Sequence, residues 1–492
     1  MVRRSEHLPL VVEALEMVGG LARTEIHNGN RMDIGGHRFF SKSDWVMDWW
    51  RRILPPPAEG SPVGYVPEEE RTLLLRPRLS RIYFLRRFFD YPVSLSAGTM
   101  KNLGLLRLGR IGLSYLWTRV FPRHPERNLE DFFVNRFGGE LYRTFFKDYT
   151  EKVWGVPCTE ISPEWGAQRI KGLSVLKALK HAAGQLLKRS SGEIAQKGVE
   201  TSLIERFLYP KLGPGQMWQV VAEQVQAGGG DIQFGRSARK FHLEHGRITA
   251  VELEDLKTGA LERIDCDAVI STMPLRDLVA GMEPAPDKEV RRVADGLMYR
   301  DFLTVGLLVR KLKANGHLVT DARTNLVPDN WIYIQEPDVR IGRLQVFNNW
   351  SPALVKAPEE TVWLGLEYFC QEGDDLWSRD DGDLGRFAIG ELEKIGLIDA
   401  ADALEFKVVR APKAYPAYFG TYDEFAVLRQ WADDIPNLYP VGRNGMHRYN
   451  NQDHSMLTAR MAVDHILGER LSKTDIWSVN TEEQYHEEKT SE

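Results

Sequence analysis

The chain has 492 residues, of which 43% are hydrophobic and 27% are charged, a composition typical of a folded protein with two or more domains. The net charge of -5 at pH 7 argues against a nucleic-acid-binding protein, because such proteins need a surplus of cations to neutralise phosphates. Three cysteines, Cys158, Cys266 and Cys370, lie far apart in the chain. The sequence therefore predicts no disulfide framework and no metal site, and it is typical of a cytoplasmic protein.

The first predicted element is a strand that ends at Glu13, in the string L-P-L-V-V-E-A-L-E-M-V-G-G-L-A-R-T. In dinucleotide-binding domains, a carboxylate at the end of such a strand hydrogen-bonds the hydroxyls of a ribose. Gly19 and Gly20 allow the backbone to approach a pyrophosphate, and Arg23 adds positive charge. Each feature alone is more typical of an ordinary turn, but together they predict a dinucleotide site.

A second glycine pair precedes a histidine in the string N-G-N-R-M-D-I-G-G-H-R-F-F-S-K. Gly35 and Gly36 predict a flexible bend, and the resemblance given below implies that this loop passes close to a ligand. His37 is a candidate catalytic base, but a hydrogen-bonded structural histidine is the interpretation we favour for it.

The region from Ser41 to about Leu203 is predicted to be mostly helical. Within it, residues 91–125 contain no acidic residue, and cations alternate with large apolar side chains. We favour a cap helix that packs on its neighbours, and the alternative is a basic amphipathic helix on an anionic membrane surface. The cations are Lys101, Arg107, Arg110, Arg119 and Arg123.

Apolar runs and alternating patterns predict strands in most of the remaining chain, including D-F-L-T-V-G-L-L-V and V-W-L-G-L-E-Y-F. The interleaving predicts a discontinuous α/β nucleotide-binding domain made of residues 1–50, 203–285 and 405–470. Residues 51–202 and 286–404 are expected to form a helical plus mixed-sheet substrate or cap domain. Residues 471–492 are expected to be a polar tail.

The last informative string is N-L-Y-P-V-G-R-N-G-M-H-R-Y-N-N-Q-D-H-S-M-L, which starts at Asn437. It predicts a short strand, a tight turn over 442–445 and a helix capped by Asn451 or Asp453. The N-terminus of that helix would direct its positive dipole toward an anionic ligand.

The string E-A-L-E-M-V-G-G-L-A-R-T resembles the E-A-x-x-x-x-G-G-x-x-x-T motif of the superfamily of FAD-dependent amine oxidases, protoporphyrinogen oxidases and UDP-galactopyranose mutases. The resemblance implies a Rossmann-like FAD-binding domain with Glu13 at the adenosine ribose. The remaining cofactor candidates that it implies are Gly19, Gly20, Arg23, Gly35, Gly36, Gly442, Arg443 and Asn451.

Two further strings resemble the mutases in particular. The segment from Gly442 to Asp453 matches G-R-x-x-x-Y-[KR]-Y-x-[DN]-x-D, with His447 in place of the first tyrosine, and it implies that Arg443 and Tyr449 contact a substrate diphosphate. The alternative for Arg443 is an ion pair with a core carboxylate. The string F-F-K-D-Y-T-E-K-V-W-G implies a substrate cleft, and packing in the core is the alternative. The substrate candidates are Tyr149, Trp154, Arg169 and Arg448, with Lys152 beside them.

In this family a G-x-G-x-x-G turn precedes the acidic residue by about 20 residues. Only 12 residues precede Glu13, and none is a glycine. Two hypotheses follow: the first strand and helix lie upstream of this start, which we favour, or the chain is a degenerate relative that binds FAD poorly.

We therefore expect an FAD-dependent oxidoreductase that moves a hydride from a small organic substrate to the flavin. One alternative is a mutase-like isomerase whose substrate is a nucleotide sugar. The other is a non-catalytic relative without a cofactor.

Overall fold

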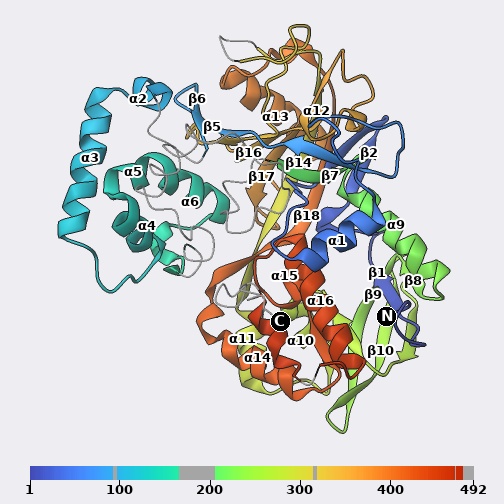
Figure 1. Ribbon diagram of the computed structural model, residues 1–492. Helices are drawn as coiled ribbons and strands as arrows, with labels where there is room; N and C mark the ends of the chain where they lie inside the picture. Colours follow the sequence, from blue (N-terminus) through green and yellow to red (C-terminus); the bar gives the residue numbers. More distant parts are fainter. Residues whose placement is uncertain (92–96, 164–165, 167–205, 314–317, 471, 480–492) are drawn as a thin grey trace, which may run out of the picture.

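The structure is a computed structural model that describes residues 1–492 except 92–96, 164–165, 167–205, 314–317, 471 and 480–492. Figure 1 shows a large sheet in the upper part, a group of helices at one side, and a mixed α/β part below. The N-terminus and the last described helix both lie in the lower part (Figure 1).

The upper part is built on a seven-stranded sheet in the order β18-β14-β17-β16-β15-β5-β6. Every residue of β17 is buried, and β17 pairs antiparallel with β14, as the continuous apolar runs of both segments predict. Helix α13 (Asp381–Lys394) packs its apolar side chains into the same core. The strands are β5 (Ser80–Phe84), β6 (Arg87–Asp90), β14 (Leu297–Val309), β15 (Trp331–Ile334), β16 (Arg343–Val346), β17 (Val362–Cys370) and β18 (Ala403–Gly420).

Residues 73–90 form strands, so the expectation of a mostly helical segment after Ser41 is wrong here. Strand β4 (Leu73–Pro77) pairs with β7 (Arg206–Pro210), and β5 and β6 form a hairpin. The two turn residues, Leu85 and Arg86, have positive φ values of 52° and 57°. Hairpin turns of this type are usually marked by Asn or Gly, and neither is present, which removed the usual sequence signal.

The expected helices lie before and after these strands. Asn128 caps α4 by accepting a hydrogen bond from the backbone N–H of Asp131. The helices are α1 (Asp44–Ile53), α2 (Ala97–Leu103), α3 (Leu105–Val120), α4 (Leu129–Phe137), α5 (Gly139–Tyr142), the π-helical turn η2 (Arg143–Lys147) and α6 (Asp148–Trp154).

The lower part contains two separate two-stranded parallel sheets among the described residues. Strand β1 (Leu10–Glu13) pairs with β8 (Asp231–Phe234), and β12 (Val269–Ser271) pairs with β19 (Leu438–Pro440). Parallel strands interleaved with helices confirm the predicted α/β class. The other elements are α9 (Pro214–Ala227), β9 (Arg236–Glu244), β10 (Arg247–Asp255), β11 (Leu261–Asp265), α10 (Leu275–Ala280), β13 (Met282–Glu283), α11 (Lys288–Asp295), α14 (Phe425–Asp434), α16 (Gln452–Ile466) and η8 (Thr474–Ser478).

Strand β18 pairs with β14 almost from end to end, within the large sheet of the upper part. The expected cofactor segment 405–470 thus begins with a strand that belongs to that sheet. The assignment of the other segments to two domains stays a prediction.

Candidate cofactor and substrate site

The carboxylate of Glu13 lies at the end of β1, where the resemblance places the ribose site. One oxygen of this carboxylate accepts a hydrogen bond from the backbone N–H of Leu15 at 2.8 Å. Gly19 and Gly20 follow with φ values of 111° and 54°, a region of backbone conformation that favours glycine. Gly20 is exposed, and a Cβ atom built on it would meet no atom within 4 Å. The backbone is therefore open to a ligand at this turn.

Arg23 is held by its own neighbours. Its Nε donates to Glu25 at 2.7 Å and its Nη1 donates to the carbonyl of Gly20 at 3.0 Å. We expected Arg23 to add positive charge beside a pyrophosphate, but Glu25 neutralises this charge. The hydrogen bond from Arg23 to the carbonyl of Gly20 stabilises the glycine turn.

The second glycine pair lies between β3 (Asn30–Asp33), which pairs with β2 (Thr24–His27), and α1. Gly35 has a φ of 106°, and Gly36 is exposed although its neighbours pack closely. A Cβ atom on Gly36 would lie 3.2 Å from Nε2 of Gln345 and 3.4 Å from the ring of Trp350. A side chain at Gly36 would therefore have to displace these groups.

His37 is partly buried, and the pKa of its ring is lowered to about 3, first by burial and then by the nearby charge of Arg443. The imidazole is therefore neutral at pH 7, and its protonated form is strongly disfavoured. A base with so low a pKa takes up a proton poorly, which weakens the expectation that His37 is a catalytic base.

The C-terminal string folds as its local pattern predicts. Strand β19 leads into the short turn α15 (Gly442–Gly445), and Asn451 caps α16. Gly442 has a φ of 73° and donates its N–H to Oγ1 of Thr458 at 3.1 Å. A Cβ atom on Gly445 would lie 2.5 Å from the carbonyl oxygen of Ser271, so the turn passes tightly against the end of β12.

The loop after His37 and the N-terminus of α16 are in direct contact. Oγ of Ser41 donates to a carboxylate oxygen of Asp453 at 2.8 Å, and the pair is buried. The effect of Arg443 on the pKa of His37 reports the same proximity. Segments about 400 residues apart in the sequence, the Gly35–His37 loop and the Gly442 turn, therefore border one region.

Arg443 lies beside a stacked pair of tyrosine rings. Its guanidinium carbon is 5.4 Å from the ring centre of Tyr415 and 4.7 Å from that of Tyr449, and the two rings are parallel within 5°. The guanidinium also donates to the carbonyls of Ala414 at 3.0 Å and Asn450 at 2.7 Å. Arg443 thus binds backbone carbonyls, and not the core carboxylate that we gave as the alternative. These contacts hold Tyr449 beside the region that His37 borders.

The other substrate candidates separate into different environments. The edge of the Tyr149 ring meets Tyr333 at 5.7 Å between ring centres. Trp154 is only 2% exposed and packs in an apolar cluster with aromatic neighbours, as the core alternative predicts. Arg448 donates to the carbonyl of Trp477 at 2.7 Å. Arg169 lies outside the described residues.

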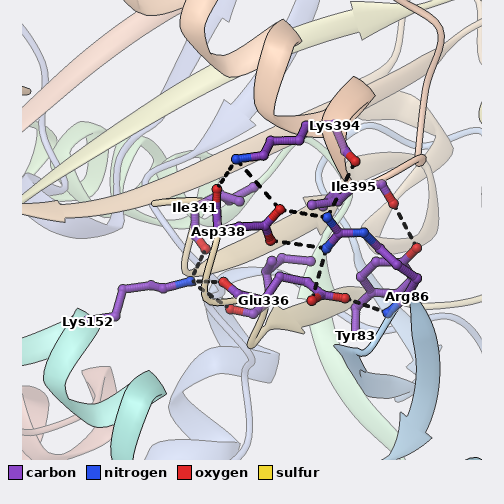
Figure 2. Close-up of polar contacts among 9 residues, drawn as sticks. Tyr83, Arg86, Lys152, Glu336, Asp338, Ile341, Lys394 and Ile395 are labelled. Carbon is purple, nitrogen blue, oxygen red and sulfur yellow. Dashed lines mark hydrogen bonds and ion pairs between the residues drawn. The ribbon is translucent and has the colours of Figure 1, made fainter.

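Lys152 does not line a cleft but binds a loop of the sheet, as Figure 2 shows. Its Nζ donates to the carbonyls of Ile334, Glu336 and Ile341 at 3.0–3.3 Å, and burial lowers its pKa to about 8. Arg86 binds the same loop through ion pairs with Glu336 at 2.9 Å and with Asp338 at 2.8 Å (Figure 2). Lys152 thus ties α6 to the sheet.

Two arginines that the sequence analysis did not select lie against a common tryptophan. The guanidinium carbon of Arg38 is 5.2 Å from the ring centre of Trp331, and that of Arg78 is 5.4 Å away from it and 5.8 Å from Tyr91. Tyr91 in turn contacts Tyr333 at 4.6 Å. We call Arg38, Arg78, Tyr91, Trp331 and Tyr333 the arginine–aromatic cluster.

The electrostatics of this cluster favour an anion. Burial and then the charge of Arg78 lower the pKa of Arg38 to about 10, which means that two guanidinium groups repel one another in a poorly solvated place. Both side chains remain partly exposed. Tyr449 also faces Arg38 closely enough to influence its pKa, so the cluster adjoins the tyrosine pair around Arg443.

Polar atoms that FAD can satisfy are buried beside these loops. Among the described residues, Nδ1 of His37, Oγ of Ser271 and Oδ1 of Asn444 are buried and make no hydrogen bond. Buried polar atoms normally have a partner, and the ring edge of a flavin offers both donors and acceptors. Together with the open backbone at Gly20 and the exposed backbone of Gly36, where a side chain would be crowded, these atoms fit the cofactor that the resemblance implies.

The comparisons with known proteins agree with this geometry. The crystal structure of reduced UDP-galactopyranose mutase is similar, with a TM-score of 0.73 and 22% identity, over 96% of this chain and 93% of that one. A protein assigned as a protoporphyrinogen oxidase from Exiguobacterium sp. 255-15 has a TM-score of 0.62 and 16% identity, over 93% and 92%. Cyclohexylamine oxidase from Brevibacterium oxydans has a TM-score of 0.57 and 13% identity, over 94% of each chain.

These structural likenesses show the fold. The sequence itself matches the profile of the family described as flavin containing amine oxidoreductase over residues 3–362, which is most of the chain. The chain therefore belongs to the flavin containing amine oxidoreductase family, and its cofactor is FAD.

Proposed function

We propose that this protein is an FAD-dependent oxidoreductase that removes a hydride from a small organic substrate carrying an anionic group. The arginine–aromatic cluster is the observation that supports this proposal. Arg38 and Arg78 lie over one tryptophan ring, partly exposed, next to the loop that carries Gly35 and Gly36. A phosphate or carboxylate would relieve the repulsion between the two guanidinium groups.

The charge of the cluster also selects against one class of substrate. A protonated amine is a cation and would be repelled by Arg38 and Arg78, although the family is named for amines. We therefore expect the anionic part of the substrate at these arginines. The aromatic rings of Trp331 and Tyr333 would flank its remaining part.

The protein residues mainly position the reactants. Bound FAD supplies the hydride acceptor. Glu13, Gly19 and Gly20 are proposed to hold its adenosine and pyrophosphate parts, and Gly35, Gly36 and Gly442 its ring. His37 stays neutral and serves as a hydrogen-bonding group, consistent with its lowered pKa.

The test is anaerobic reduction of the bound flavin, followed by its visible absorbance, with a panel of anionic and cationic substrates. R38Q and R78Q should each weaken binding of an anionic substrate about 10- to 100-fold, the loss expected for a charge-assisted hydrogen bond, with the flavin content unchanged. R87Q is the matched control, because Arg87 is exposed on β6 of the same sheet. Rapid flavin reduction by cationic amines in wild type, unchanged in R38Q, would contradict the proposal.

A second candidate is a nucleotide-sugar isomerase similar to UDP-galactopyranose mutase. The contact of Arg443 with the rings of Tyr415 and Tyr449 supports it, since the resemblance to the mutases implies that Arg443 and Tyr449 contact a substrate diphosphate. This reaction leaves no net change in redox state. The test is to incubate the reduced protein with UDP-galactopyranose under anaerobic conditions and to analyse the product by chromatography. Conversion of the sugar would favour the isomerase. Reduction of the oxidised flavin by the substrate would favour the oxidoreductase.

A further inference from the structure

Helix α3 lies at the outer edge of the helical group (Figure 1). It exposes several large apolar side chains. The exposed fractions of these side chains range from 58% to 89%. We call them the α3 face: Leu105, Leu106, Leu113, Leu116, Trp117, Val120 and Phe121, the residue that follows the helix. Soluble proteins rarely expose so many large apolar side chains together, and such a patch usually marks an interaction site.

The direction of this face is fixed by contacts on the other side of the helix. A Cβ atom on Gly138 would lie 2.8 Å from the Cα of Tyr115, so the absence of a side chain lets α3 approach the α4–α5 junction. Oγ of Ser114 accepts a hydrogen bond from the backbone N–H of Glu140 at 3.0 Å, and Thr118 is the buried residue of the helix. Leu108 and Ile111, on the same side as these groups, are partly buried and pack against the core. The helix thus packs on its neighbours, as we favoured from the sequence, and it also presents a second apolar side outward.

Cations flank the α3 face on both sides. At about 100° per residue, the apolar side chains of the helix span an arc of about 120°, and Arg110 and Arg119 lie just beyond its two edges. Within the described residues Lys101, Arg107, Arg110 and Arg119 form no ion pair, whereas Arg123 pairs with two carboxylates. Residues 91–125 contain no acidic residue.

We propose that the α3 face docks the protein onto an anionic lipid membrane surface. An apolar arc bordered by arginines suits the boundary between acyl chains and headgroups, where the guanidinium groups reach anionic phosphates. Trp117 and Phe121 are in contact, at 4.6 Å between ring centres, and aromatic rings favour this depth. Among the helices that the structure describes, none has the length and apolar content needed to cross a membrane, so the helix would lie on the surface.

The same charges disfavour a second copy of the chain as the occupant. A two-fold symmetric dimer through the α3 face would bring this face against itself and place the arginines of both copies close together. Helix α3 itself supplies no acidic partner to such a contact, because residues 91–125 contain no carboxylate. An anionic lipid surface supplies negative charge along the whole helix.

The experiment is co-sedimentation of the FAD-loaded full chain with vesicles of phosphatidylcholine alone or mixed with phosphatidylglycerol. We expect binding to the mixed vesicles that weakens as salt is added. R110Q/R119Q should lower the partition coefficient about 25-fold, about 5-fold for each charge removed. L113E/W117E should abolish binding. L261E is the matched control, because Leu261 is 60% exposed on β11 in the lower part of the molecule.

Both variants change exposed residues of α3, so FAD content and the melting temperature should match those of wild type, which shows that folding is intact. Absence of wild-type binding to mixed vesicles would overturn the proposal. Equal binding to both kinds of vesicle, unchanged in R110Q/R119Q, would overturn the role of charge. A dimer in analytical ultracentrifugation that L113E/W117E dissociates, without vesicle binding by wild type, would assign the α3 face to a second copy instead.

Discussion

The buried carboxyl group of Asp33 should make the stability of this protein fall as the pH rises from acid to neutral. Asp33 is the last residue of β3, just before the Gly35–His37 loop, and it is 1% exposed. Burial raises its pKa from 3.8 to about 7, although hydrogen bonds donated by Tyr209 and by Thr24 at 3.1 Å partly oppose this shift. Between these two pH values the folded chain binds more protons than the unfolded chain, so the free energy of unfolding decreases as pH increases.

The magnitude follows from the two pKa values. Asp33 contributes its full stability below pH 3.8, and this contribution is lost as the pH rises through 7. A difference of about three pH units corresponds to about 4 kcal/mol, at 1.36 kcal/mol for each unit, and about 2.5 kcal/mol of it falls between pH 5 and pH 8. D33N has no ionisable group at this position, so its free energy of unfolding lacks this pH dependence. Relative to wild type, the free energy of unfolding of D33N should therefore increase by about 2.5 kcal/mol from pH 5 to pH 8.

The assay is urea unfolding of wild type and D33N at a series of pH values, followed by fluorescence. D265N, at an exposed aspartate on β11, is the matched control and should stay parallel to wild type. Y209F removes a hydrogen bond that favours the ionised carboxylate, so it should move the upper end of the transition above pH 7. Parallel curves for wild type and D33N between pH 5 and pH 8 would refute the reasoning.

Three further predictions concern the loops of the site. G445A should weaken FAD binding at least tenfold, because its Cβ atom would lie 2.5 Å from a backbone carbonyl of β12. G390A, at an exposed and uncrowded position of α13, should bind FAD like wild type. Equilibrium titration with FAD compares the two variants. E367Q should cost about 3–5 kcal/mol in urea unfolding, because it leaves the charge of Arg343 buried without its ion-pair partner, and a loss below about 1 kcal/mol would contradict this. H37Q and wild type should show parallel pH profiles for flavin reduction from pH 5 to pH 9, because the pKa of His37 is about 3, and an ionisation that H37Q removes in this range would show that His37 titrates there.

Local patterns predicted the structure well where neighbouring residues decide it. The strand, glycine turn and helix around Gly442 and Asn451 form as expected, because a positive φ and an N-cap are properties of a few adjacent residues. The hairpin at Leu85 and Arg86 was missed for the same reason, since these residue types do not mark the turn that they form.

The arginine–aromatic cluster could not be found in the same way. Arg38, Arg78 and Trp331 come from three distant segments. The pairing of β5 with β15 brings Arg78 and Trp331 together, and Phe39, next to Arg38, pairs with Leu208 of β7. Arg38 follows the glycine pair directly, and its position next to His37 was the one available signal.

The orientation of α3 could not be predicted from its amphipathic pattern. The sequence pattern gives an apolar side and a basic border, but it does not say which side faces the protein. The close approach at Gly138 and the hydrogen bond to Ser114 decide this, and both depend on the following helices.

The central claim is that the end of β1 and the glycine turn before α16 hold one FAD molecule. The most direct test is a crystal structure of the FAD-loaded protein. We predict that the ribose of the adenosine lies within hydrogen-bonding distance of the Glu13 carboxylate and that the flavin ring lies against Gly35, Gly36 and Gly442. FAD bound elsewhere, or folded protein that retains no FAD in the presence of excess cofactor, would contradict the claim.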